Sequence, residues 1–382
     1  MPFSGKATYS SGVSLPEIAE DVSDLVSINS PHETPLLDAL GDPARAARST
    51  VHEWIEDTLL LNTALTGNNT FADPSTDTSV KVTNASTFRV GDQVQPEGGI
   101  EVMLVTAINS GNNTLTITRG YGGSTAEDLI SDMPLRILGN AALEGADADA
   151  ARFTARARRT NYTQIFSATV EVSGSELAVR QIGVADELDY QKQQRTRELL
   201  RDLENSVING RAPAANPQGT STVRRTMRGI VGSIASNRFL AGIDGFPAGA
   251  TLTEAQVNEA LRLIWKSSSG NVNLIVVGGP EKRAINQFVA ASRRFTPQSD
   301  SYRDMVSTYE SDFGVCRIVL SRWVPAGMVL LLDSSRIDVM PLSGRSFHYK
   351  PLAVTGDKES GQILGEYTLE LRNESAHGVI QV

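Results

Sequence analysis

Apolar residues are sparse and irregularly spaced from residue 1 to about 48, where serine, glycine and proline break up the chain. Ile18, Val22 and Leu25 fall at helical spacing, so we expect one short helical piece there. A segment with so little apolar surface does not fold alone. We therefore expect an arm that lies on another surface, with a disordered tail as the alternative that composition leaves open.

Two later stretches have the pattern of extended strands. Residues 50–61 contain Trp54 as an apolar anchor, and residues 162–173 mix apolar positions with threonine and serine. We expect these two stretches to pair as a long antiparallel ribbon. The connection between them is about a hundred residues long, which is improbable for a bare loop. The connection should therefore be a domain of its own.

Residues 78–140 supply that domain. Short apolar runs lie at 80–82, 93–94, 101–107 and 114–118, and glycine-rich or asparagine-rich turns separate them. Short strands at regular spacing with such turns are typical of a small β-barrel or β-sandwich. We expect this domain to be an insertion within the ribbon.

A long amphipathic helix is predicted from about Ser175 to Asn209, with an interruption at Gly183. Its apolar stripe includes Leu199 and Leu203, the opposite face is charged, and Gly210 is a natural stop. Twenty-five helical residues would span roughly 38 Å. Such a helix fits a beam across a flat subunit, although an ordinary surface helix has the same pattern.

The C-terminal half alternates between helical and strand patterns. Thr253 and Gln256 form a capping box before a helix, and residues 272–277 are a buried strand. A second helix begins after Gly278-Gly279-Pro280. Further strands are expected at 315–320, 328–332, 336–340 and 362–372. This mixture predicts an α+β fold.

Composition and charge narrow the classes of protein that fit this chain. It has 382 residues, of which 40% are hydrophobic, a formal net charge of −9 and one cysteine. Length and hydrophobic content suggest two or three domains. A single cysteine excludes an internal disulfide and a thiolate metal site. The negative charge argues against a dense cationic face for duplex binding, and the absence of a signal-peptide or membrane-spanning pattern suggests an intracellular, soluble product.

Residues that often carry chemistry are not arranged as sites. No two histidines have metal-ligand spacing; they are His32, His52, His348 and His377. Cys316 lies in an apolar strand and is interpreted as buried packing. The turn at Gly278-Gly279 could attract an anion at a helix N-terminus, but a tight turn that needs glycine fits it better. We expect no catalytic residue, cofactor, metal site or enzymatic activity.

Two arginine clusters are the remaining candidates for a binding role. They are Arg152, Arg156, Arg158 and Arg159 at the base of the ribbon, and Arg224, Arg225 and Arg228 after a linker. The first cluster could pair with carboxylates of a neighbouring subunit or with nucleic acid, and a solvated charged turn is the alternative. An isolated arm and ribbon would expose backbone edges and apolar side chains. Interlocking copies of the chain would cover them.

Several stretches carry a resemblance to a known family. They are Ile28–Leu36, Asn161–Phe166, Val172–Gly174, Asp312–Gly314, Leu352–Asp357, Glu366–Glu370 and Asn373–Gly378. Together they resemble the tailed-bacteriophage major capsid proteins with the HK97-like fold, in the SU10-type branch. The resemblance covers nearly the whole chain, and its motifs indicate lineage rather than catalysis.

The resemblance implies a domain map within the α+β class. It comprises an N-terminal arm at 1–48, an extended loop at 49–172 with the all-β insertion at 78–140, a peripheral domain with the spine helix and linker at 173–225, an axial domain at 226–340, and C-terminal strands at 341–382 that return to the peripheral domain. The insertion departs from a bare hairpin loop, so it should decorate or clamp the outside of a shell. That departure also puts covalent lysine–asparagine cross-linking in doubt.

The function implied by the resemblance is that of a major capsid protein. It would self-assemble into hexamers and pentamers that form an icosahedral or prolate head around double-stranded DNA. Assembly would occur in the host cytoplasm, with a separate scaffolding protein, a portal, and decoration or cement proteins as further partners. The packaged DNA would make weak non-specific contacts, and no membrane is involved. The alternatives are another virion protein, of the tail or decoration type, and a small α/β enzyme that uses the Gly278-Gly279 turn.

Contacts between subunits are expected on the ribbon. Trp54 and Phe166 are the predicted hot spots, because large aromatic side chains dominate interface energies. The arginines nearby would set the register between copies; they are Arg152, Arg156, Arg158 and Arg159.

Overall fold

The computed structural model describes residues 33–43, 45–145, 147, 151–154, 156–179, 186–292, 308–353 and 356–382, without the side chains of 288–292. The helical piece expected near Ile18 and the histidine at position 32 lie outside these residues. The chain divides into two compact units, which are described separately. The first unit contains residues up to Trp54 and from Arg158 onward, and the second contains Ile55–Ala157.

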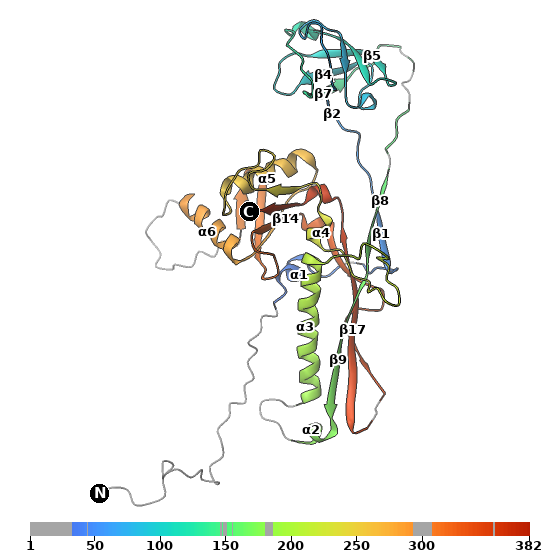
Figure 1. Cartoon of the computed structure of the whole chain (residues 1–382), viewed down its shortest axis with the longest axis vertical. Coiled ribbons are helices and arrows are strands. Elements are labelled where there is room, and N and C mark those ends of the chain that lie inside the picture. The colour runs from blue at the N-terminus through green and yellow to red at the C-terminus, as the bar shows by residue number, and fades with distance from the viewer. Residues whose placement is uncertain are drawn as a thin grey trace, which may run out of the picture. The chain divides into compact units, whose positions relative to one another are not determined.

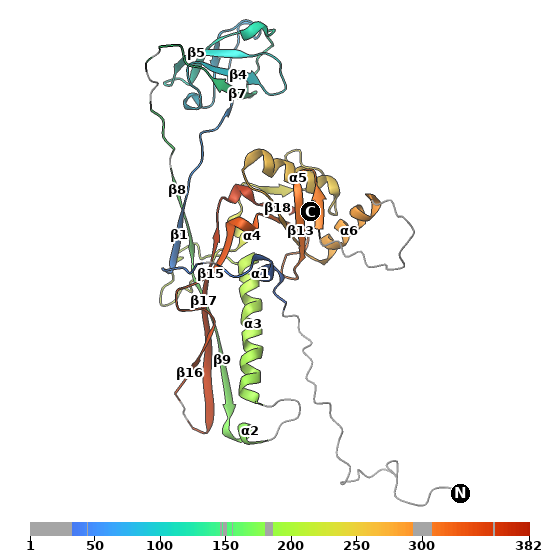
Figure 2. The ribbon, with the colours of Figure 1, turned by 180° about the vertical axis from the view of Figure 1, so that it is seen from behind.

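Among the described residues, the α-helices all belong to the first unit (Figures 1 and 2). They are α1 (Pro35–Leu40), α2 (Gly174–Ala178), α3 (Glu187–Asn209), α4 (Ile230–Ser233), α5 (Glu254–Ser267) and α6 (Gly279–Ser292). The capping box predicted at Thr253 and Gln256 is present at the start of α5. The apolar stripe predicted for the long helix is buried in α3, which begins at Glu187 and is therefore shorter than expected.

A six-stranded sheet forms the centre of the first unit. Its order is β10 (Arg238–Leu240), β18 (Gly378–Gln381), β14 (Met328–Leu332), β11 (Leu274–Val277), β13 (Gly314–Leu320) and β12 (Thr308–Ser311). Alternate residues of β11 point into two separate cores: Ile275 faces the core under α5 and α6, and Val276 faces the core under α3 and α4. The sheet is thus buried on both faces at β11, as the continuous apolar run at 272–277 predicted.

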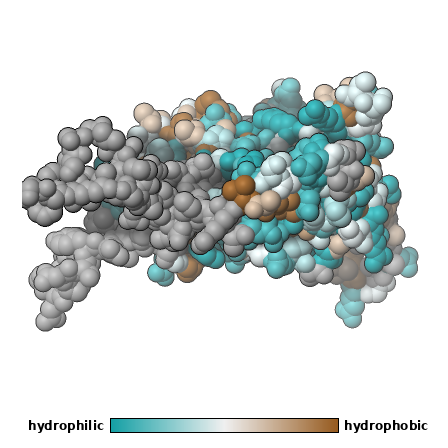
Figure 3. Space-filling model, turned by 90° about the horizontal axis from the view of Figure 1, so that it is seen from below, coloured by the Kyte–Doolittle hydropathy of each residue, from teal (hydrophilic) through white to brown (hydrophobic). Residues whose placement is uncertain are grey.

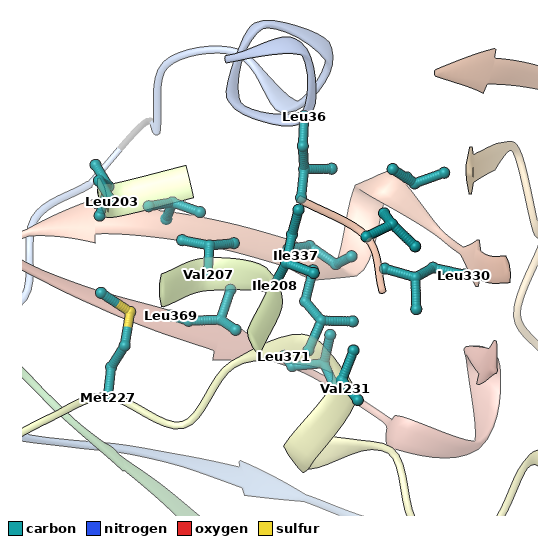
Figure 4. Close-up of a cluster of buried hydrophobic side chains, with 14 of the residues drawn as sticks. Leu36, Leu203, Val207, Ile208, Met227, Val231, Leu330, Ile337, Leu369 and Leu371 are labelled. Carbon is teal, nitrogen blue, oxygen red and sulfur yellow. The ribbon is translucent and has the colours of Figure 1, made fainter. Parts of the chain in front are cut away.

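A second sheet surrounds the long strand β17 (Lys358–Leu371). On one side β17 pairs antiparallel with β9 (Gln164–Ser173), and on the other with β15 (Ile337–Pro341) and β16 (His348–Pro351). Helix α3 lies along this sheet (Figures 1 and 2). Figure 4 shows the core between them, where Leu203 and Val207 of α3 lie near Leu369 of β17.

The ribbon differs from its predicted pairing. Strand β1 (Val51–Glu56) pairs with β8 (Ala157–Tyr162), whereas residues 164–173 form β9 and pair with β17. The alternating apolar residues of β9 are buried against the core of the first unit, which buries more apolar surface than a two-stranded ribbon could. The more polar β8 remains in the ribbon, where Arg158 pairs with Glu53 of β1 at 3.3 Å.

The C-terminal segment divides between the two sheets of the first unit. Residues 341–382 do not stay in one sheet, because β17 belongs to the sheet with β9 whereas β18 pairs with β14 and β10. The change of sheet occurs at Asn373, whose φ of 51° lies in the left-handed region that asparagine tolerates. The last strand therefore ties the two sheets of the first unit together.

The second unit is an all-β domain. Its six-stranded sheet has the order β2 (Thr63–Leu65), β7 (Pro134–Asn140), β4 (Asp92–Pro96), β5 (Met103–Asn109), β6 (Thr114–Thr118) and β3 (Ser79–Lys81). Side chains such as Val94, Val105 and Leu115 form its own core. Arg119 makes a bidentate pair with the buried Glu101 at 2.7 and 2.8 Å. The domain therefore has the internal contacts of an independently packed unit.

His377, just before β18, is fully buried and makes two specific hydrogen bonds. Its Nδ1 accepts a bond from the Asp333 N–H at 3.1 Å, so Nε2 carries the proton and faces the Arg372 carbonyl at 3.3 Å. Burial lowers the pKa of His377 from 6.5 to about 4. The folded state therefore holds this ring neutral.

We expect the free energy of unfolding to fall as the pH decreases from about 6.5 to about 4, because the unfolded chain then binds a proton that the folded chain does not. The full loss from this one group is about 3 kcal/mol. Urea unfolding of dilute, unassembled protein at several pH values measures it, with His377→Gln as the variant that cannot titrate. Equal pH dependence of the two proteins would show that His377 contributes nothing.

Candidate assembly surfaces

The short helix α1 is held on α3 by a buried carboxylate. The Leu36 and Leu37 N–H groups in its first turn need acceptors, and Thr34 makes no side-chain cap. Glu204 of α3 accepts both bonds through Oε2, at 3.2 and 3.3 Å. Its other oxygen accepts a bond from Ser321 at 3.1 Å. The start of the described chain is thus fixed to the long helix by a cap that comes from a distant part of the sequence.

Burial opposes the charge on this carboxylate. Glu204 is fully buried, and burial raises its pKa above the ordinary range although the three hydrogen bonds act in the opposite direction. A charged acceptor makes stronger bonds to backbone N–H groups than a neutral one. Docking of α1 therefore depends on Glu204 remaining available as an acceptor.

The polar face of β17 holds two further buried carboxylates. Glu366 accepts bonds from Thr163 Oγ1 and Arg225 Nη2, both at 2.6 Å, and pairs with Arg345 at 2.8 Å. Only 2% of Glu366 is exposed. These contacts join the start of β9, the linker after α3 and the turn before β16 to a single side chain.

Glu370, four residues later on the same face, is bound in the same manner. It pairs with Arg45 at 2.6 Å and with His52 at the start of the ribbon. Burial would raise the pKa of Glu370, but the His52 hydrogen bond and the Arg45 charge outweigh it and hold the pKa below its usual range. The arm and the ribbon therefore leave the first unit from one charged junction on β17.

The sequence pattern predicted a strand at 362–372, which is present in β17, but it did not predict the burial of this polar face. Glu366, Thr368 and Glu370 alternate with the apolar residues and are equally buried. One signal in the sequence could have indicated this polar face. Glu366 and Glu370 are four residues apart and alternate with apolar residues, and the linker and arm contain arginines that could pair with them. Their partners are about 140 and 325 residues away in sequence, so pairing could not be inferred from spacing.

The six residues predicted for subunit contacts do not form one cluster. Trp54 is half-buried in the ribbon, with its ring centroid 5.9 Å from that of His52. The four arginines are all exposed, but Arg152 and Arg156 belong to the second unit, whereas Arg158 and Arg159 belong to the first. Arg152 donates to the Ser86 carbonyl at 2.6 Å, within its own unit.

Phe166 is placed differently from the prediction. Only 5% of it is exposed, and its ring packs edge-on against Phe347 with a centroid distance of 6.3 Å. Its large apolar surface is already covered by the core of its own chain. Phe166 is therefore a core residue of the second sheet, and little of its side chain is left for the predicted contact with another subunit.

Exposed apolar side chains that the sequence analysis missed flank the all-β domain. Leu59, Leu61, Leu143 and Phe153 are 90, 70, 83 and 87% exposed, respectively. Leu60 and Phe153 line a shallow hollow together with Arg152 and Arg156. Elsewhere, the view in Figure 3 shows described residues that are mostly hydrophilic, with hydrophobic atoms in small groups. A concentration of exposed leucine and phenylalanine marks a surface that another molecule covers. We name Leu59, Leu60, Leu61 and Phe153 the ribbon patch.

The candidate sites for catalysis are ordinary structural features. At the Gly278-Gly279 turn, the Glu281 side chain is buried and accepts a bond from the Gly327 N–H at 2.8 Å. Its carboxylate lies against the turn, since a Cβ on Gly278 would lie 2.7 Å from Oε2, and a negative charge there disfavours an anion. Cys316 is buried, and burial raises its pKa to about 11, so it stays a thiol.

Among the described residues, no three metal-ligating side chains lie together. No helix in that part of the chain is long and apolar enough to cross a membrane.

Comparisons with known proteins identify a family from the sequence and a fold from the structure. The family described as SU10 major capsid protein matches residues 3–382. The capsid of a native GTA particle has a TM-score of 0.56 at 10% identity, with 98% of each chain covered. The capsid of Myoviridae phage XM1 has a TM-score of 0.51 at 8% identity, with 97% of this chain and 99% of that chain covered. These likenesses show an HK97-like capsid fold. The search of curated proteins found no significant match.

We expect Glu204→Ala to lower the free energy of unfolding by about 2–4 kcal/mol, because it leaves two buried N–H groups and one hydroxyl without an acceptor. Protease cleavage near α1 should also accelerate, since the helix loses its attachment. The matched control is Glu198→Ala on the same helix, where an exposed ion pair with Arg195 contributes less than about 1 kcal/mol. Equal effects of the two substitutions on stability and cleavage would contradict the assigned role of Glu204.

Proposed function

The chain belongs to the SU10 major capsid protein family, and from this premise we propose that its copies form the hexamers and pentamers of a phage head. The head would be icosahedral or prolate and would enclose double-stranded DNA. The observation that carries the proposal is the family match over residues 3–382. As a major capsid protein, the chain is a structural component of the virion, and we propose that it has no enzymatic activity.

The proposed domain map follows the units and sheets of the fold. The arm ends with α1 and the strand-like segment up to residue 48, and the extended loop consists of the ribbon and the second unit. The peripheral domain consists of α3 with the sheet around β17. The axial domain contains the six-stranded sheet, and we assign β18 to it because this strand pairs with β14. This assignment moves the last strand out of the peripheral domain.

The proposed mechanism of assembly separates a fixed junction from segments that reach other copies. The junction on β17 and the Glu204 cap fix where the ribbon and arm leave the first unit. The ribbon patch then packs against a neighbouring copy, which covers the exposed leucines and phenylalanine of the patch. Burying apolar surface at about 25 cal/mol per Å² makes each such contact modest, and repetition over a closed lattice makes the sum large.

Other partners are proposed from the family alone. A scaffolding protein would guide closure, a portal would occupy one vertex, and decoration or cement proteins would bind the outside. Packaged DNA would make weak electrostatic contacts with the inner surface, and salt would screen these contacts. Assembly would occur in the cytoplasm of the host.

Electron microscopy of the expressed protein, alone and with the products of neighbouring genes, tests the proposed function. We expect closed polyhedral particles or flat sheets of hexamers. Tubes would favour a tail protein, and a uniform monomer under both conditions would contradict the proposal.

We expect Phe153→Ser to reduce the yield and the heat resistance of particles, because the patch loses its largest exposed apolar side chain. The unassembled subunit should keep its stability within about 0.5 kcal/mol, since the side chain is 87% exposed. The control is Ile243→Ser, which removes a half-exposed apolar side chain from the first unit. Particles that form and melt like the wild type would exclude the ribbon patch as a contact.

A further inference from the structure

Charge is divided unevenly between the two units. Residues 55–157 contain 13 Asp and Glu against 6 Lys and Arg, a net charge of −7. The rest of the chain therefore carries only −2 of the total of −9. The second unit is a strongly acidic module on a nearly neutral subunit, so the two units present surfaces of different electrostatic character.

A concentration of arginines lies where the ribbon joins the first unit. Five exposed arginines lie on the segments that meet at the corner between β8 and β9, and we name them the arginine belt. They are Arg48, Arg158, Arg211, Arg224 and Arg228. Among the residues that the structure describes, only Arg158 of these five forms an ion pair, with the exposed Glu53. The belt therefore presents positive charge to a partner.

Backbone contacts hold the belt together at this corner. Asn161 accepts a bond from the Arg228 N–H at 2.8 Å and donates to the Arg228 carbonyl at 2.9 Å. Thr226 donates to the Arg211 carbonyl at 2.7 Å. The Thr163 N–H donates to the carbonyl of Thr50, two residues after Arg48. Segments that are far apart in sequence thus bring their arginines to one surface.

The belt also has an apolar neighbour. Ile165 begins the exposed face of β9 and is 50% exposed. It lies two residues after Thr163, whose carbonyl accepts a bond from Arg225 Nε at 2.8 Å. A cationic rim beside an exposed isoleucine is typical of a surface for an acidic protein partner with its own apolar centre.

One end of the second unit has the complementary character. Two isoleucines there, Ile100 and Ile130, are 71 and 60% exposed. Exposed carboxylates surround them in neighbouring loops; these are Asp73, Glu97, Asp128 and Asp132. We name these six residues the insertion tip.

Backbone bonds connect the loops of the insertion tip. The Ile100 N–H donates to Glu127 at 3.2 Å, and the Leu129 N–H donates to the Pro74 carbonyl at 3.1 Å. The Asp132 N–H and the Thr66 hydroxyl tie the loop around Ile130 to the same region. The tip is therefore one continuous surface within the second unit.

We propose that the insertion tip of one copy docks on the arginine belt of a second copy. Every copy carries both surfaces, and their charges are opposite. The tip contains two exposed isoleucines, and the belt lies beside the exposed Ile165. Duplex DNA would satisfy the arginines but would leave the acidic, isoleucine-bearing tip without a partner. This inference rests on the proposed assembly function, and it adds the electrostatic contact that sets register between copies.

Two charge-reversed proteins test the docking. The belt variant is Arg224→Glu/Arg228→Glu, and the tip variant is Glu97→Lys/Asp128→Lys. Each alone should give at least about tenfold fewer particles than the wild type, because like charges then face each other. A mixture of the two should recover heteromeric assemblies, since each reversed surface meets its complement on the other protein. Circular dichroism of the unassembled variants checks folding, and Arg283→Glu/Arg317→Glu controls for the change in net charge.

Each outcome either supports docking between copies or overturns it. A further protein, the four-substitution chain, carries the belt and the tip substitutions together. Recovery in the mixture and in the four-substitution chain supports contact between copies. Recovery only in the four-substitution chain shows contact within one copy and overturns the proposal. Normal shells with reduced DNA content in the belt variant would show that DNA is the partner, which also overturns it. If the wild type forms no shells at all, the proposed function fails rather than the docking.

Discussion

Two carboxylates on the polar face of β17 are removed from water and are surrounded by arginines from distant parts of the chain. Glu366 and Glu370 each replace their lost hydration with at least two charged or hydrogen-bonded partners. Breaking one side of such a buried pair is costly, whereas the intact pair contributes little net stability. Its value is that only one arrangement satisfies every charge. The arm, the ribbon and the linker after α3 therefore converge on β17 in a single geometry.

That geometry matters because the exposed surfaces lie on the segments that leave the junction. The second unit carries the exposed leucines and Phe153 of the ribbon patch, and it also carries most of the excess negative charge. A lattice of identical copies requires each outgoing segment to start from the same place in every copy. The buried core of α3 and β17 (Figure 4) supplies the rigidity behind that starting point. Flexible contacts between copies can then be individually weak without loss of register.

Sequence patterns predicted elements better than the pairing between them. Helical periodicity located α3 and α5, and the Thr253 capping box fixed the start of α5. The ribbon pairing was wrong because alternation in residues 164–173 shows that one face is apolar but not which strand will cover it. The burial of Phe166 was not foreseen for the same reason, since β17 and Phe347 cover it from about 180–200 residues away. The buried glutamates were not predicted because their partners are also distant in sequence. The exposure of Phe153 was not predicted because it depends on which segments pack around the side chain in the folded chain.

The central claim is that each copy keeps an unchanged junction on β17 while its ribbon and second unit cover a different copy. A cryo-electron microscopy map of assembled particles at side-chain resolution tests it directly. The account predicts Glu366 and Glu370 still bound to Arg225 and Arg45 of their own chain, with the ribbon patch buried against a neighbouring chain. It would be contradicted by a map in which the ribbon patch contacts only its own chain or stays exposed to solvent in the closed shell.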